Sequence, residues 1–204
     1  MEKDLTTEAK IKEAATRVFI VKGFNGCSSR EIAKEAGMNV ALVNYHFQSK
    51  SHLFEVVVAT VMEQFVFSML DILKSDLPLI SKTRIFIEKE YDFLSKHPDI
   101  PSFIINELGK KDKKFFEKID FIDQIKQTKI FEEIIESQQK GEVRKMDVTS
   151  IMLLMMANCH FPFMAKPMIQ TIQNIDDNTY QNQLTLHKQY VTEMLVNYLF
   201  PTNK

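Results

Sequence analysis

The chain has 204 residues, of which 45% are hydrophobic and 26% are charged, and its formal net charge is −1. The apolar content is enough for a buried core in one or two domains, and the near-neutral charge does not by itself indicate a nucleic-acid partner. Two cysteines are too few for a disulfide framework, no signal-peptide pattern occurs, and no apolar run reaches the roughly 18 residues of a membrane span. A cytoplasmic protein is therefore expected.

Glycine and proline are scarce, with 5 and 6 copies. Because few turn formers are spread over many residues, long helices are favoured over short strands, and an all-α fold is predicted. The first helix is expected from about Thr7 to Lys22, where Ile11, Ala14, Ala15 and Val18 recur at the spacing of one helix face. Gly23 follows where a left-handed residue is expected to end a helix.

A capping box begins the second predicted helix. Ser28 and Glu31 have the required spacing: the Ser hydroxyl accepts from the backbone N–H three residues on, and the Glu carboxylate reaches back to the Ser backbone. Gly37 is expected to end this helix, because glycine adopts a left-handed backbone without steric cost.

A third short helix is predicted after the turn. Asn39 can cap it, and Val43 and Phe47 lie four residues apart on its inner face. Two short helices around a glycine-containing turn form a helix-turn-helix, whose second helix enters the DNA major groove.

This stretch resembles the DNA-binding signature of the TetR family of transcriptional regulators. The resemblance rests on Arg30-Glu31-Ile32-Ala33, Ala36-Gly37-Met38, Tyr45-His46-Phe47 and Lys50. Motif residues match over roughly the first 55 positions. The remainder resembles the family only in its length, helical pattern and order of helices. The resemblance implies a helix-turn-helix DNA-binding domain at residues 1–49 and a helical effector-binding and dimerisation domain at residues 50–204.

The resemblance also implies DNA-contact roles for ten residues. Those expected to contact phosphates or flanking bases are Ser28, Arg30, Tyr45, His46 and Lys50. The base-reading surface is expected to comprise Asn39, Val40, Ala41, Leu42 and Asn44. The sequence departs from the family here, because many members have a lysine or another polar residue in place of Val40 and a tyrosine in place of Asn44.

The outward residues suggest which bases are read. We hypothesise that Ala41 and Leu42 contact thymine methyl groups and that Asn44 bonds adenine, which predicts a half-site rich in A·T pairs near its centre. In the alternative, Val40 and Leu42 pack against the first helix, and Asn44 and Arg30 do most of the reading.

Long helices are predicted for the rest of the chain. Their expected ranges are Lys50 to Lys74, Lys82 to Lys96, Ser102 to Leu108, Lys114 to Lys140, a helix capped by Asp147, and Thr179 to Phe200. Pro162 and Pro167 are expected to kink or end the helix after Asp147, and its apolar run from Ile151 to Ala165 is interpreted as buried. The resemblance implies that the last two long helices pair with their copies in a homodimer.

Two side-chain groups in the body leave alternatives open. Candidates for an apolar effector pocket with polar anchors are Tyr91, Phe103, Met155, Asn158 and His160. The methionines near residue 155 fit either a deformable pocket or a dimer core. The four lysines between Lys110 and Lys114 fit either a solvated helix–helix turn or an accessory DNA contact.

Cys159-His160 lacks a second pair at metal-ligand spacing, so a buried thiol and a hydrogen-bonded imidazole are predicted, without metal or cofactor.

The sequence therefore predicts a ligand-responsive DNA-binding regulator. The expected form is a repressor that binds a palindromic operator as a homodimer and is released by a small apolar or amphipathic effector. One alternative is control by a protein partner. A remote alternative is an all-α enzyme, although no P-loop, HExxH motif or Gly-rich fingerprint occurs.

Overall fold

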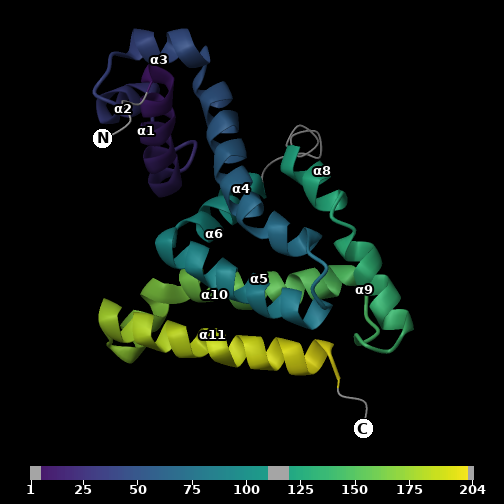
Figure 1. The fold of residues 1–204 in the computed structure, drawn as a ribbon. Helices are drawn as coiled ribbons and strands as arrows, with labels where there is room; N and C mark the ends of the chain where they lie inside the picture. Colours follow the sequence, from purple (N-terminus) through teal and green to yellow (C-terminus); the bar gives the residue numbers. More distant parts are fainter. Residues whose placement is uncertain (1–5, 110–119, 202–204) are drawn as a thin grey trace, which may run out of the picture. The chain divides into compact units, whose positions relative to one another are not determined.

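The computed structural model describes residues 6–109 and 120–201, and the ordered elements in these ranges are all helical (Figure 1). The described chain divides into two compact units, one of residues 6–65 and 102–109 and the other of residues 66–101 and 120–201. Residues 50–65 thus cluster with the N-terminal helices, and the predicted domain boundary after residue 49 stays a prediction.

The first unit contains three short helices, α1 (Thr7–Lys22), α2 (Ser29–Glu35) and α3 (Val40–Phe47), which we call the head. α2 packs against both α1 and α3, and α3 runs across α1 rather than along it (Figure 1). The predicted buried face of α1 is confirmed for Ile11, Ala14 and Ala15, and Phe19 completes it, whereas Val18 is half-buried.

An aromatic cluster closes the core of the first unit. The Phe54 ring, from the first part of α4 (Lys50–Lys74), lies edge-on to Phe19 at 5.1 Å and to Phe24 at 5.0 Å between centroids. Phe103, from α6 (Ile100–Phe103), contacts the same ring at 5.9 Å. A π-helical turn (Ile104–Leu108) follows, so the helix predicted from Ser102 to Leu108 is present with a wider final turn.

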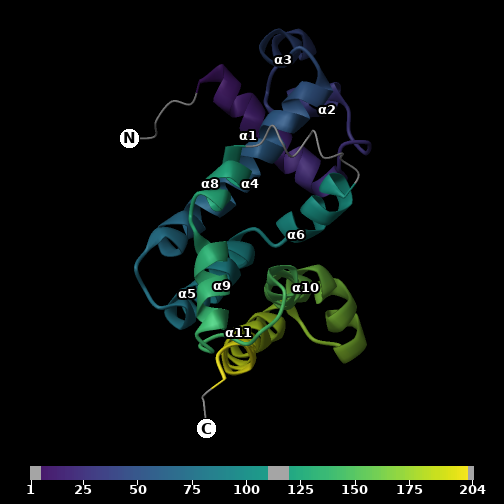
Figure 2. The ribbon, with the colours of Figure 1, turned by 90° about the vertical axis from the view of Figure 1, so that its right-hand side faces the viewer.

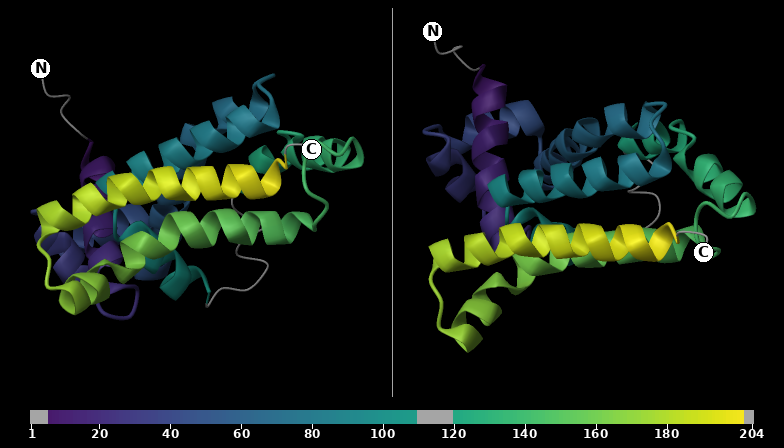
Figure 3. Two further views of the ribbon diagram at one scale, coloured as in Figure 1. Left: turned by 90° about the horizontal axis from the view of Figure 1, so that it is seen from below. Right: turned by 60° about the horizontal axis from the view of Figure 1, so that its bottom comes forward.

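The second unit is a helical bundle built on α5 (Leu79–Lys96), α10 (Val148–Gln173) and α11 (Asp177–Leu199), which contact one another pairwise. α10 and α11 lie side by side in both further views (Figure 2, Figure 3). What we call the core cluster comprises Ile87, Tyr91, Leu94, Cys159, Phe163, Leu184, Val191 and Leu195.

Two predicted helix boundaries need correction. α5 begins at Leu79 instead of Lys82, because Pro78 occupies the cap position with a fixed φ that suits a helix start. The continuous helix predicted from Lys114 to Lys140 is wrong within the described residues. It is divided into α8 (Asp120–Lys126) and α9 (Ile130–Gln139), because Lys129 adopts a left-handed φ of 57° between them. Residues 110–119 lie outside the described ranges, so both interpretations of the four lysines between Lys110 and Lys114 stay predictions.

α10 continues through both prolines and changes direction in its last part, so the prolines kink it rather than end it (Figure 3). The prediction that the apolar run from Ile151 to Ala165 is buried is wrong for several of its residues in the single chain. Met152, Leu153, Met156 and Phe161 are between 44% and 61% exposed. α10 is also long and apolar enough to span a membrane by length and composition, a test that the core helix of a soluble protein passes as well.

Candidate nucleic-acid interface

The predicted capping box is present at the start of α2. The Ser28 hydroxyl accepts from the Glu31 backbone N–H at 3.3 Å, and the Glu31 carboxylate accepts from the Ser28 backbone at 2.8 Å and from its hydroxyl at 3.0 Å. The second Glu31 oxygen accepts from Lys22 of α1 at 2.7 Å. This one carboxylate therefore caps α2 and ties it to α1.

These contacts make Glu31 a pH-dependent part of the head. The pKa of Glu31 is lowered to about 2, mainly by the hydrogen bond from Lys22 and in addition by the two donors of Ser28. A carboxyl group whose folded pKa is lowered stabilises the fold above its unfolded pKa of about 4.3, and that stabilisation is lost as the pH falls toward the folded pKa.

We expect Glu31→Gln to lower the melting temperature at pH 7, and the difference from the wild type to shrink between about pH 4.5 and pH 2. Thermal unfolding followed by circular dichroism across this range measures it. Glu55→Gln, on an exposed part of α4, is the matched control. A difference that persists unchanged down to pH 2 would contradict the assigned role.

The turn between α2 and α3 also has its predicted geometry. Gly37 has a φ of +67°, and the backbone N–H of Met38 donates to the carbonyl of Ala33 at 2.9 Å. Asn39 then accepts from the Leu42 backbone at 2.8 Å and caps α3. A helix-turn-helix is thus set by three local devices: the capping box, the left-handed glycine and the asparagine cap.

α3 has one buried and one exposed face. Val43 and Phe47 are 2% and 4% exposed and hold the helix on the head, as predicted. Ala41 and Asn44 are exposed, and Tyr45 is 81% exposed. Val40, Leu42 and His46 are half-buried, and Arg30 of α2 is exposed. The face available to DNA therefore centres on Ala41, Asn44 and Tyr45, and its reading of bases stays a prediction.

Three of the predicted contact residues have polar atoms already engaged within the head. The Ser28 hydroxyl belongs to the capping box, and the Asn39 side-chain oxygen caps α3. The Lys50 ammonium donates to the backbone carbonyls of Phe24 at 2.8 Å and Cys27 at 2.9 Å. These intramolecular bonds leave less of each side chain for a phosphate.

In the second unit, four of the five predicted pocket residues gather between α5 and α10. The Tyr91 hydroxyl donates to the Asn158 carbonyl at 3.0 Å, Met155 packs on the core cluster, and His160 contacts Glu90 at 2.6 Å between Nε2 and Oε1. The predicted buried thiol and hydrogen-bonded imidazole at Cys159-His160 are confirmed. Phe103 belongs to the first unit, so its place in a pocket stays a prediction.

Glu90 is a residue that the sequence reasoning missed. It is 1% exposed, and its Oε2 has no hydrogen-bond partner among the residues that the structure describes. The pKa of the neighbouring Cys159 thiol is raised, mainly because the thiol is buried and in addition because Glu90 lies beside it. The burial of Glu90 could have been predicted from the sequence. Ile87, Glu90, Tyr91 and Leu94 follow the i, i+3, i+4, i+7 spacing of one helix face, and that face is otherwise apolar.

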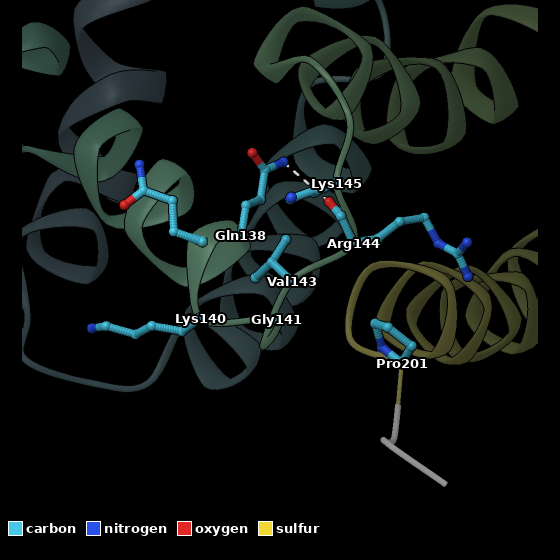
Figure 4. Close-up of a pocket in the computed structure, with 8 residues that line it drawn as sticks. Gln138, Lys140, Gly141, Val143, Arg144, Lys145 and Pro201 are labelled. Atoms are coloured by element: carbon cyan, nitrogen blue, oxygen red, sulfur yellow. Dashed lines mark hydrogen bonds between the residues drawn. The ribbon is translucent and has the colours of Figure 1, made fainter.

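Two open clefts lie elsewhere in the second unit. One, of about 550 Å³, is lined by Gln138, Val143, Arg144, Lys145 and Pro201 among others (Figure 4). The Gln138 amide donates to the Arg144 carbonyl at 3.0 Å in its wall. The other, of about 530 Å³, lies between residues 77–80, α9 and Phe200. None of the five predicted pocket residues lines either cleft.

A head with a capped helix-turn-helix and an exposed second helix, followed in the chain by a helical body, defines the class of helix-turn-helix DNA-binding regulators. Residues 11–57 match the family model for bacterial regulatory proteins of the tetR family. The protein named probable HTH-type transcriptional regulator YttP, of Bacillus subtilis strain 168, is 32% identical over 139 residues. That alignment covers 67% of this chain and 66% of the relative, just under two thirds of its length.

Solved structures share the fold over nearly the whole chain. A TetR family transcription regulator from Marinobacter aquaeolei VT8 has a TM-score of 0.73 at 14% identity, covering 95% of each chain. FadR from Bacillus subtilis in complex with stearoyl-CoA has a TM-score of 0.63 at 21% identity, covering 92% of this chain and 96% of that one. This chain belongs to the TetR family of transcriptional regulators.

Proposed function

We propose that the protein is a cytoplasmic repressor that binds a palindromic operator as a homodimer and is released by a small effector. The observation that carries the proposal is the exposed face of α3 on a helix-turn-helix whose turn and both caps are formed. Two such helices, held about one DNA turn apart, would enter successive major-groove faces. An effector that prefers a state unable to span both half-sites lowers operator affinity by its differential affinity for the two states.

The exposure of the side chains on α3 and of Arg30 supports a different base or phosphate contact for each of them. Asn44 is exposed, which suits a bidentate contact to adenine, and Ala41 is exposed, which suits a contact to a thymine methyl group. Leu42 is half-buried, so part of its side chain serves packing and part remains for a methyl contact. Arg30, exposed on α2, supplies a cation for a phosphate or for guanine. A half-site with A·T pairs at its centre follows.

Operator selection from random duplexes tests this proposal. We expect a palindromic consensus with A·T pairs at the core positions, and Asn44→Ala to lose discrimination at one of them by about 10-fold or more. Asn182→Ala, on an exposed part of α11, is the matched control and should keep the wild-type consensus. A core made of G·C pairs would refute the base assignment, and no enrichment above nonspecific binding would refute the proposed function.

The proposed dimer surface comprises apolar side chains left uncovered on α10 and α11. They are Met152, Leu153, Met156, Phe161, Leu186, Tyr190 and Met194, each at least 44% exposed in the single chain. Large exposed apolar patches mark interaction sites, and these helices are the ones that the family resemblance pairs across a two-fold axis. The methionines divide accordingly: Met152 and Met156 face outward, and Met155 packs inward.

The proposed effector site is the buried pair of Glu90 and His160, which lies beside Cys159 of the core cluster. A buried carboxyl oxygen without a donor is costly, so the site is suited to a ligand that brings one. Tyr91, Phe163 and Leu94 of the core cluster suit an apolar body. The FadR structure holds stearoyl-CoA, which supports a long apolar ligand for this fold. We therefore propose an amphipathic effector with a donor group, preferably cationic, at its head.

Control by a protein partner is the second candidate. The observation that favours it is that neither of the two clefts described above is lined by Glu90 or His160. The ligand-binding experiment in the Discussion separates the two candidates.

A further inference from the structure

Lys50, the half-buried first residue of α4, has an unusual set of partners for a cation next to a DNA-binding head. Its ammonium donates to the carbonyls of Phe24 at 2.8 Å and Cys27 at 2.9 Å, and lies 4.3 Å from the centroid of the Phe24 ring. Both carbonyls belong to the loop between α1 and α2. An ammonium has three N–H donors, so two carbonyls and a ring face occupy most of its bonding capacity.

The backbone just before Lys50 is strained. Gln48 has a φ of 60° and a ψ of −46°, and the N–H of Ser49 donates to the carbonyl of Phe47 at 2.5 Å. This is a γ-turn with a positive φ at a residue other than glycine, a rare and strained conformation. It forms the whole junction between α3 and α4.

A strained turn persists only where both flanks are fixed by other contacts. On one side Phe47 is buried at 4% exposure. On the other, Ser49 accepts from the backbone of His52 at 3.1 Å, and Lys50 is bonded to the α1–α2 loop. The same loop leads into Ser28, the cap of α2. Lys50 therefore connects the end of α3 with the start of α2, the two elements whose relative position sets the DNA-facing surface.

We infer that Lys50 is a positioning residue, which holds the strained α3–α4 junction against the α1–α2 loop and so keeps α3 in its DNA-binding position. This inference rests on the proposed DNA binding of the head. It differs from a direct phosphate contact, because the ammonium acts through the carbonyls of Phe24 and Cys27.

The salt dependence of DNA binding separates the two roles. Lys50→Met keeps the apolar stem and removes the ammonium. A positioning role predicts that operator affinity falls at least 10-fold while the slope of log affinity against log salt concentration is unchanged. A phosphate contact predicts that the slope falls by about one for each protomer, because one fewer counterion is released. That second result would overturn the inference. Arg30→Gln, which removes an exposed cation, is the comparison variant.

A rescue variant tests the link to Gln48. Glycine adopts a positive φ at no steric cost, so Gln48→Gly should restore much of the binding lost in Lys50→Met. A lost phosphate contact would not be restored, and no rescue would count against the inference. Folding of each variant is checked by circular dichroism. If Lys50→Met does not fold, Lys50→Gln is titrated in its place with the same expected slopes.

A parallel titration on a nonspecific duplex distinguishes failure of this inference from failure of the proposed function. Nonspecific binding depends on the same phosphate contacts. A wild-type protein without any specific operator would refute the proposed function, whereas the slope for Lys50→Met on the nonspecific duplex would still decide the role of Lys50.

Discussion

Replacing Leu153 with Glu is expected to leave the protein monomeric and to lower operator affinity by at least about 100-fold. Leu153 is 61% exposed on α10 in the single chain. In a two-fold symmetric dimer each substitution occurs twice, and a charge buried at an apolar interface without a partner is strongly unfavourable. Because one protomer then binds one half-site, the gain from linking two recognition helices, about 10²–10⁴-fold, is lost.

Sedimentation equilibrium and an operator titration measure the two effects on the same protein. Ile135→Glu is the matched control, because Ile135 is an exposed apolar residue of α9 at 46% exposure, outside the proposed dimer surface. It should remain dimeric with operator affinity unchanged. A dimeric Leu153→Glu protein with wild-type affinity would show that α10 does not form the interface.

Glu90→Gln is expected to weaken binding of a long-chain amine by about 30-fold or more. Removal of one partner of a buried, hydrogen-bonded charge pair costs about 2–5 kcal/mol, and each 1.4 kcal/mol is tenfold in affinity. The amide oxygen can keep the bond to His160, whereas the NH₂ group in place of Oε2 opposes an ammonium. The substitution therefore removes the ligand contact with little change in side-chain volume.

Calorimetric titration with decylamine, decanol and decanoate compares head groups on one apolar chain. We expect affinity in that order for the wild type, and decylamine to release the operator. Asp92→Asn, which removes an exposed carboxylate from the same helix, is the control and should bind decylamine as the wild type does. Tighter binding of decanoate would refute the cationic head group. No binding of any probe would favour control by a protein partner.

The head could be predicted from the sequence because its signals are local. Ser28 with Glu31, Gly37 and Asn39 each act within three or four residues, and the structure has all three devices where the sequence predicts them. The engagement of Lys50 could not be predicted in this way. Its acceptors lie 26 and 23 residues earlier in the chain, and only the folded head brings them together.

The second unit was less predictable, because its structure depends on contacts between residues that are far apart in the chain. Nothing in the composition around Lys129 signals a left-handed residue, and the break between α8 and α9 shows itself only in the backbone. The apolar pattern of α10 predicted burial, which a sequence cannot assign to the core of one chain or to a second copy. Leu153 and Cys159 both belong to that pattern, yet Leu153 is 61% exposed and Cys159 is 0% exposed.

The contrast between local contacts in the head and distant contacts in the body has a consequence for biosynthesis. The head packs residues that are close in the chain, whereas Glu90 and His160 are 70 residues apart. Local contacts form fast, and N-terminal segments fold first during synthesis. The head can therefore form before α10 and α11 have left the ribosome. Under the proposed function, a nascent chain would have a folded head but could not yet dimerise. It would therefore bind DNA weakly until its translation ends.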